Sequence, residues 1–187
     1  MASHPIRLPG FEFRLPEDDR DRKLLSDVES HGWHIVIIPA GEHGPGFVFT
    51  VGLYLRTLQP EILIMGVPPD PSARVLNAIG DYAMQGGEIV AGRRYPRFVD
   101  RCDVEFRPIA PRHFREHFGY AIWFYRKWDW GSRRSNASIL ISKECFRESQ
   151  DTQSSFKNCS RFYPNRGKDN QTAQPGATDN PDDAPRL

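Results

Sequence analysis

The chain has 187 residues, enough for one domain with a hydrophobic core. Its 25 Lys and Arg residues are balanced by 24 Asp and Glu residues, so the formal net charge is only +1. No broad positive field favours nucleic acid or anionic lipid, and we expect neither as a partner. The opening MASHPIRLPG has no apolar core of an export signal, and the longest apolar runs are too short to span a bilayer.

Three cysteines are spread widely along the sequence, at Cys102, Cys145 and Cys159. An odd number at such spacings favours neither a disulfide framework nor a Cys-x-x-Cys metal knuckle. We therefore expect a reducing environment and a cytoplasmic location.

The first elements are predicted from apolar periodicity and from glycine and proline positions. Residues 17–30 carry Leu24, Leu25 and Val28 at helical spacing, and Gly32 is placed to end that helix. Residues 33–38 and 47–55 are rich in β-branched and aromatic residues, and the connection AGEHGPG joins them. We expect two antiparallel strands here.

The next elements follow the same logic. Residues 61–67 form a strongly apolar run between prolines, which predicts a central strand. A helix is expected to begin at Asp70 and to end at Gly86, a bent strand to cover residues 88–99, and an alternating strand to begin at Cys102. Pro111 is expected to open a last helix, with apolar residues on one face as far as Tyr125.

This order predicts an α+β fold in which two to three helices pack on a mainly antiparallel sheet. After Ile141 there is no Val, Ile, Leu or Met until Leu187, so the end of the chain cannot bury enough apolar surface to fold. We expect an N-terminal extension over residues 1–16, a single domain over residues 17–140, and a polar, largely disordered tail over residues 141–187.

Histidines gather in the first half of the chain, at His31, His34 and His43. If the glycine-rich connection folded back over the end of the first helix, these imidazoles and Glu42 would make a metal site or an acid–base pair. The favoured alternative is that His31 caps the helix C-terminus and that the glycines only turn the chain.

A second histidine pattern, HFREH, matches the H-x-x-E-H arrangement of one metalloprotease class. On a helix, His113 and His117 would lie one turn apart and share zinc, with Glu116 as the general base. No third ligand is evident in the sequence, so an amphipathic helix with two solvated or partly covered histidines is the preferred interpretation, and we assign no metal ligands.

Two polar residues lie within the predicted core, Thr50 and Glu61. A carboxylate at the start of an apolar strand either stays hydrated or has a raised pKa and acts as an acid or base. A basic and aromatic stretch follows at Arg93, Arg94 and Tyr95, but acidic neighbours favour a solvated edge strand over a phosphate or RNA site.

Several segments resemble, in order and spacing, a bacterial domain-of-unknown-function family, number 4262: HGWHIVIIPA, GPGFVFTVGL, PEILIMGV, SARVLNAIGDYAMQGG, VEFRPI and AIWFYR. The likeness covers about residues 21–126. It implies a compact cytosolic α+β domain and carries no established reaction, cofactor or catalytic residue. The motif is most recognisable around six residues: His31, Gly32, Trp33, Thr50, Gly52 and Glu61.

The C-terminal part departs from that family, whose members continue past FYR with an apolar strand and a Trp-Pro-Asp stretch. Here the chain reads KWDWGSRRSNASILISKECFRES. We hypothesise that a frameshift replaced the last strand, which would leave a sheet edge or a core face uncovered.

The leading functional hypothesis is a non-catalytic ligand-binding or regulatory module. Its pocket would be bordered by five residues: His31, Trp33, His43, Thr50 and Glu61. One alternative is a hydrolase or transferase in which His31 or His43 is the general base and Glu61 its partner. Another is an immunity-type protein-interaction module. The sequence identifies no cofactor, and it leaves open whether the partner is a small molecule or a protein.

Overall fold

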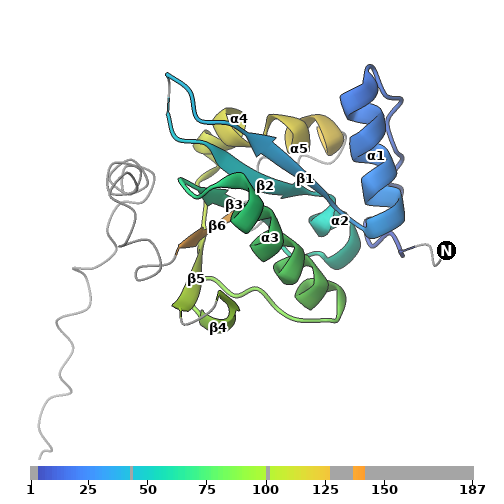
Figure 1. Ribbon diagram of the computed structural model, residues 1–187. Helices are drawn as coiled ribbons and strands as arrows, with labels where there is room; N and C mark the ends of the chain where they lie inside the picture. Colours follow the sequence, from blue (N-terminus) through green and yellow to red (C-terminus); the bar gives the residue numbers. More distant parts are fainter. Residues whose placement is uncertain (1–3, 43, 100–101, 127–136, 142–187) are drawn as a thin grey trace, which may run out of the picture.

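The computed structural model describes residues 4–42, 44–99, 102–126 and 137–141. These residues form a six-stranded sheet with the order β1-β2-β3-β6-β5-β4 (Figure 1). The strands are β1 (His34–Ile38), β2 (Phe47–Val51), β3 (Glu61–Met65), β4 (Arg94–Val99), β5 (Cys102–Pro108) and β6 (Ala137–Ile141). All neighbours pair antiparallel except β3 and β6, which are parallel. The predicted α+β fold with a mainly antiparallel sheet is confirmed.

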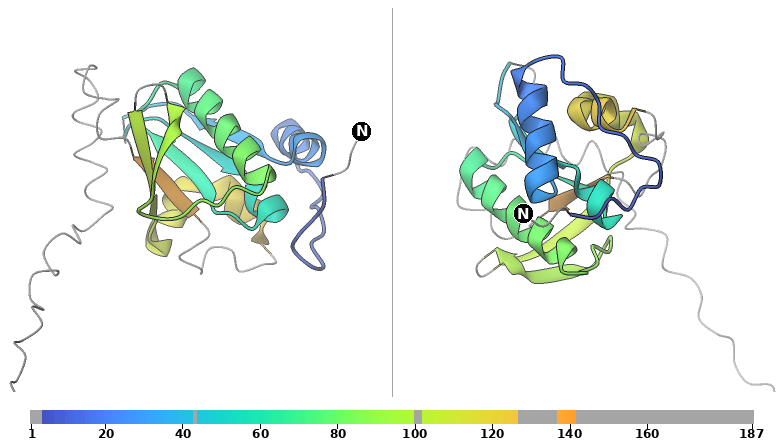
Figure 2. Two further views of the ribbon diagram at one scale, coloured as in Figure 1. Left: turned by 90° about the horizontal axis from the view of Figure 1, so that it is seen from below. Right: turned by 90° about the vertical axis from the view of Figure 1, so that its right-hand side faces the viewer.

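Helices cover both faces of this sheet (Figures 1 and 2). The described α-helices are α1 (Asp19–His31), α2 (Leu53–Thr57), α3 (Pro69–Met84), α4 (Phe114–His117) and α5 (Gly119–Phe124), and a 3₁₀ turn, η1 (Pro111–His113), precedes α4. The first helix ends at Gly32 as predicted. Two to three helices were expected, and the additional ones are short.

Strand alternation divides the core into two apolar clusters, one on each face of the sheet. Phe49 and Val51 of β2 pack with residues of α1, α4 and α5, whereas Val48 packs with α3. Successive side chains of a strand point to opposite faces, so one strand supplies both clusters.

The second strand is shorter than the apolar pattern predicts. It ends at Val51, Gly52 adopts a left-handed φ of 104°, and α2 follows at once. An added Cβ at Gly52 would lie 2.8 Å from Cγ2 of Val28 in α1. A positive φ and a close neighbour both favour glycine at this position. The left-handed turn ends β2, and α2 begins at the residue where the strand was expected to continue.

The last predicted helix is divided. Instead of one helix from Pro111 to Tyr125, the chain forms η1, α4 and α5, and Phe118 leaves the helical region between α4 and α5 with φ −118° and ψ 36°. The expected bent strand over residues 88–99 is reduced to β4, which begins at Arg94.

The segment Ala137–Ile141, which lies in the stretch that departs from the family pattern, forms a central strand. It pairs with β3 on one side and with β5 on the other. The expectation of a missing last strand and an uncovered sheet edge is therefore wrong, because β6 joins the two halves of the sheet. The predicted tail, apart from Ile141, lies outside the described residues.

Two further expectations concern chemistry and environment. Cys102, the one cysteine within the described residues, is disulfide-bonded, although the number and spacing of the cysteines favoured no disulfide framework. Within the part of the chain that the structure describes, no helix is long and apolar enough to cross a membrane.

Trp33, just before β1, contacts helix α3 through a hydrogen bond and through ring packing. Its buried indole donates a hydrogen bond from Nε1 to Oδ1 of Asn77 at 3.2 Å. The ring packs against the backbone of Gly80, where an added Cβ would lie 2.5 Å from Cε2 and Cζ2 of the indole. Glycine at residue 80 is thus required by the neighbouring ring rather than by its own backbone conformation.

Replacing this glycine tests the contact. We expect Gly80→Ala to lower the free energy of unfolding by about 1–3 kcal/mol, because overpacking against Trp33 outweighs the better helix propensity of alanine. Gly119→Ala is the control, since nothing lies within 4 Å of an added Cβ there. Urea denaturation of both variants measures the difference, and equal stability of the two would contradict the proposed packing.

Candidate functional site

Glu61, the first residue of β3, is completely buried, with 0% of its surface exposed. Its Oε1 accepts hydrogen bonds from the backbone N–H of Gly52 at 2.8 Å and of Tyr54 at 3.2 Å. These amides lie at the start of α2, where backbone N–H groups lack partners within the helix. The carboxylate of β3 therefore caps α2, and it does so across the end of the neighbouring strand β2.

Two hydroxyl groups complete the surroundings of this carboxylate. Thr50 donates from Oγ1 to Oε2 of Glu61 at 2.6 Å, and Tyr125 donates its phenolic proton to Oε1 at 2.5 Å. Each hydroxyl in turn accepts a backbone N–H, from Ile62 at 2.9 Å and from Leu55 at 3.2 Å. Since both hydroxyls accept these amides, their own protons are directed to Glu61.

We call Thr50, Glu61, Tyr125 and the amides bound to them the carboxylate network. All three side chains are buried, and four donors meet the two carboxylate oxygens. A buried polar group is tolerated when its hydrogen bonds are satisfied, and this network satisfies them. It joins β2, β3, α2 and the end of α5.

The electrostatics of the network follow from its burial. Loss of solvent raises the pKa of the Glu61 carboxyl, and the hydrogen bonds from Thr50 and Tyr125 oppose that rise. Burial and the neighbouring carboxylate raise the pKa of Tyr125 well above its ordinary value. The network thus holds a buried carboxyl group with altered acidity that connects four elements of the fold.

The five residues predicted to border a pocket are distributed as follows. Thr50 and Glu61 are brought together in the carboxylate network. Trp33 lies in the cluster beneath α3. His31 is exposed at the end of α1, where its Nδ1 lies 2.8 Å from Oγ of Ser30. His43 lies outside the described residues.

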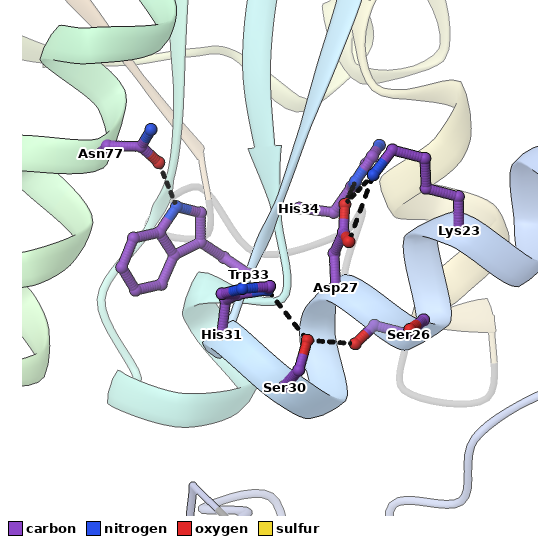
Figure 3. A network of polar contacts seen from close by, with 8 residues as sticks. All are labelled: Lys23, Ser26, Asp27, Ser30, His31, Trp33, His34 and Asn77. Atoms are coloured by element: carbon purple, nitrogen blue, oxygen red, sulfur yellow. Dashed lines mark hydrogen bonds and ion pairs between the residues drawn. The ribbon is translucent and has the colours of Figure 1, made fainter. Parts of the chain in front are cut away.

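A second polar group, at the junction of α1 and β1, contains a histidine that the leading hypothesis left out. Nδ1 of His34 lies 2.7 Å from Oδ2 of Asp27, and the same carboxylate oxygen is 3.0 Å from Nζ of Lys23 (Figure 3). Lys23 and Asp27 are four residues apart on α1, so they share one face of that helix. We call Lys23, Asp27 and His34 the junction triad.

The junction triad orients the imidazole of His34. Burial lowers the pKa of His34, and the hydrogen bond and charge of Asp27 oppose that change. In the neutral ring the carboxylate selects the tautomer with the proton on Nδ1, which leaves a lone pair on Nε2. Asp27 contacts Nδ1 and not Nε2, no hydrogen bond among the described residues uses Nε2, and 16% of the side chain is exposed.

The HFREH motif is placed differently from the protease hypothesis. His113 belongs to η1, whereas Glu116 and His117 belong to α4. His117 is buried with its ring edge-on to Phe47, at 5.1 Å between centroids, and burial lowers its pKa. Among the described residues, no group of three or more His, Cys, Asp or Glu side chains is arranged to hold a metal ion.

Sequence reasoning missed two participants, Tyr125 and Asp27. Tyr125 was assigned to an apolar helix face, and its spacing in the sequence did not indicate a hydrogen bond to Glu61, 64 residues earlier. Asp27 had a weak signal, because Lys23 and Asp27 form an i, i+4 pair of opposite charge. Its second contact, to His34, depends on how the strand returns beside the helix.

Comparison with known proteins identifies a family of the chain. Residues 27–133 match the family model described as Domain of unknown function (DUF4262), which confirms the resemblance drawn from the motifs. No curated protein and no solved structure matches the chain. The matched range contains the carboxylate network, and of the junction triad it contains Asp27 and His34.

The carboxylate network predicts a large effect of a small substitution. Thr50→Val keeps the shape of the side chain, but it removes a donor to Glu61 and leaves the amide of Ile62 unsatisfied, so we expect a loss of about 2–3 kcal/mol of folding free energy. Thr50→Ser is the matched control, since it keeps the hydroxyl and removes one methyl, at about 1 kcal/mol. Urea denaturation compares them, and a Val variant as stable as the Ser variant would argue against the network.

The raised pKa of Glu61 predicts a pH dependence of stability. The folded state binds this proton more tightly than the unfolded state, so the contribution is highest below the unfolded pKa of about 4.3 and declines as pH rises toward the folded pKa. The measurement is the free energy of unfolding of the wild type minus that of Glu61→Gln, from pH 4 upward. We expect this difference to fall, and a difference that rises with pH would contradict the raised pKa.

Proposed function

The chain belongs to the family Domain of unknown function (DUF4262), and we propose that it acts as a non-catalytic ligand-binding or regulatory module. The burial of Glu61 supports this proposal. General acid–base catalysis requires a group within hydrogen-bond reach of the substrate, and Glu61 is enclosed by four donors from its own chain. In the proposal, Thr50 and Glu61 hold β2 and β3 together and do not touch the ligand.

The observation that carries the proposal is the oriented imidazole of the junction triad. Asp27 holds Nδ1 of His34, and the other ring nitrogen is left with an acceptor lone pair beside a partly exposed surface. A fixed ring binds a ligand with less loss of conformational entropy than a mobile one. The ligand is therefore a small molecule or peptide that donates an O–H or N–H to Nε2 of His34.

Residues around the triad shape this surface. Lys23 neutralises Asp27, so that the carboxylate does not repel an anionic group on the ligand. His31 and Trp33 belong to the segment between α1 and β1: His31 adds an exposed imidazole, and Trp33 anchors the start of the strand that carries His34. His43 stays a proposed member of the site on sequence grounds.

A second candidate function is favoured by the same pair of side chains. A histidine held by a carboxylate through Nδ1 is the arrangement of a general base and its orienting group. A hydrolase or transferase would then use His34, rather than His31 or His43, to accept a proton. This alternative requires a nucleophile from water or from the substrate, and it predicts turnover as well as binding.

Native mass spectrometry of the purified full-length chain tests the proposal. We expect an additional mass that disappears on denaturation and whose occupancy falls at least about tenfold in His34→Gln, because that variant loses the oriented acceptor. Asp70→Asn is the control, since Asp70 is exposed in the first turn of α3 and does not belong to the α1–β1 junction. Circular dichroism confirms that both variants are folded.

Two results would contradict the proposal. One is a bare mass after incubation with a cell extract, and the other is a bound mass that survives in His34→Gln. A bound molecule that is chemically changed on standing would instead favour the enzyme alternative.

A further inference from the structure

The N-terminal segment, residues 4–16, crosses the domain without forming a helix or a strand. We call it the strap. In Figure 2 the strap, in dark blue, passes α2 and loops around α5 before it enters α1. It precedes residues 27–133, the range that matches the family model, whereas the elements beneath it lie within that range. The strap thus lies outside the matched range and covers a surface formed by elements within it.

Apolar side chains of the strap insert into that surface. Leu8 is buried in the same cluster as Leu55 and Tyr125. The ring centroid of Phe11 lies 5.1 Å from that of Phe124 in α5, and Phe13 lies 6.1 Å from the same ring. Phe11 and Phe13 point inward while the intervening Glu12 is exposed, which is the alternation of an extended peptide.

Polar contacts hold the strap at separate points along its length. The backbone N–H of Arg7 donates to the carbonyl of Leu55 at 2.9 Å. Nη1 of Arg56 donates to the carbonyl of His4. Farther along, Nη1 of Arg14 donates to the carbonyl of Trp123 at 3.1 Å. These contacts lie at intervals along the strap and do not form a strand ladder, so the segment opens at less cost than the sheet.

Arg56 has one unsatisfied donor beneath the closed strap. Only 4% of this residue is exposed, its second amino group donates to the carbonyl of Val28 at 3.0 Å, and its Nε has no partner among the described residues. Its guanidinium also lies over the ring of Phe13, 5.9 Å from the centroid, so contacts within the closed state recover only part of the hydration that burial removes. Opening the strap returns water to Arg56 and offsets part of the apolar contact that is lost.

We propose that the strap is displaceable and that the surface beneath it docks an extended peptide of a partner protein. That peptide carries the strap's own chemistry: a leucine followed by two aromatic residues separated by one position. The surface offers the rings of Phe124 and Tyr125 to the aromatic residues, and the carbonyl of Leu55 and the guanidinium of Arg56 to the peptide backbone. The strap competes for this surface as an internal ligand.

Fluorescence anisotropy with a labelled peptide of residues 4–15, HPIRLPGFEFRL, tests this proposal on the full-length chain. In the wild type the tethered strap competes at an effective concentration of about 1 mM, and Phe13→Ala weakens that competition. We expect the peptide to bind Phe13→Ala at least tenfold more tightly than the wild type. A peptide with alanine at both phenylalanine positions should not bind.

Leu15→Ala is the matched control variant, because Leu15 belongs to the strap but is 88% exposed. It should bind the peptide as weakly as the wild type does. Equal affinity of Phe13→Ala and Leu15→Ala, or no binding to a folded Phe13→Ala, would overturn the proposal.

Hydrogen exchange on the wild type keeps the test independent of any variant's folding. If the strap is displaceable, the amide of Arg7 exchanges faster than the paired amides of β2 and β3, through local opening. Exchange of Arg7 at the same rate as those strands, under conditions where exchange reports the opening equilibrium, would show that the strap opens only with global unfolding and would overturn the proposal.

Discussion

The structure depends on one buried carboxylate that is shared by four elements. Glu61 begins β3, accepts the first amides of α2, and is held by hydroxyl groups from β2 and from the end of α5. A carboxylate in the core is costly unless its oxygens are satisfied, so each of these elements must be in place for the others to be stable. The left-handed turn at Gly52 brings the first amides of α2 to this carboxylate.

This arrangement separates the polar groups of the domain by role. Glu61, whose pKa is raised by burial, is enclosed by donors of its own chain, although a perturbed carboxyl is often the mark of an active site. The junction triad is partly exposed, and in it Asp27 orients His34. We place the proposed function at the α1–β1 junction because His34 is partly exposed there, whereas Glu61 is completely buried.

The fold was largely predictable because its main elements carry local signals. The apolar spacing and Gly32 predicted α1, and the isolated apolar run predicted β3. Where the prediction failed, the deciding contact was distant in sequence. In sequence, Leu53–Thr57 resembles the continuation of a strand, but in the structure it is a helix whose first amides bind Glu61. Ala137–Ile141 is a central strand because it pairs with β3 on one side and with β5 on the other.

The candidate site divides in the same way. The sequence by itself determined that Thr50 and Glu61 are polar residues within an apolar core, and that histidines gather around the first helix and strand, because composition and periodicity are local properties. Only the tertiary structure decided that Tyr125 closes the carboxylate network, that Asp27 holds His34, and that the strap covers α2 and α5. Hydrogen-bond partners many residues apart are set by packing, and no spacing in the sequence encodes that packing directly.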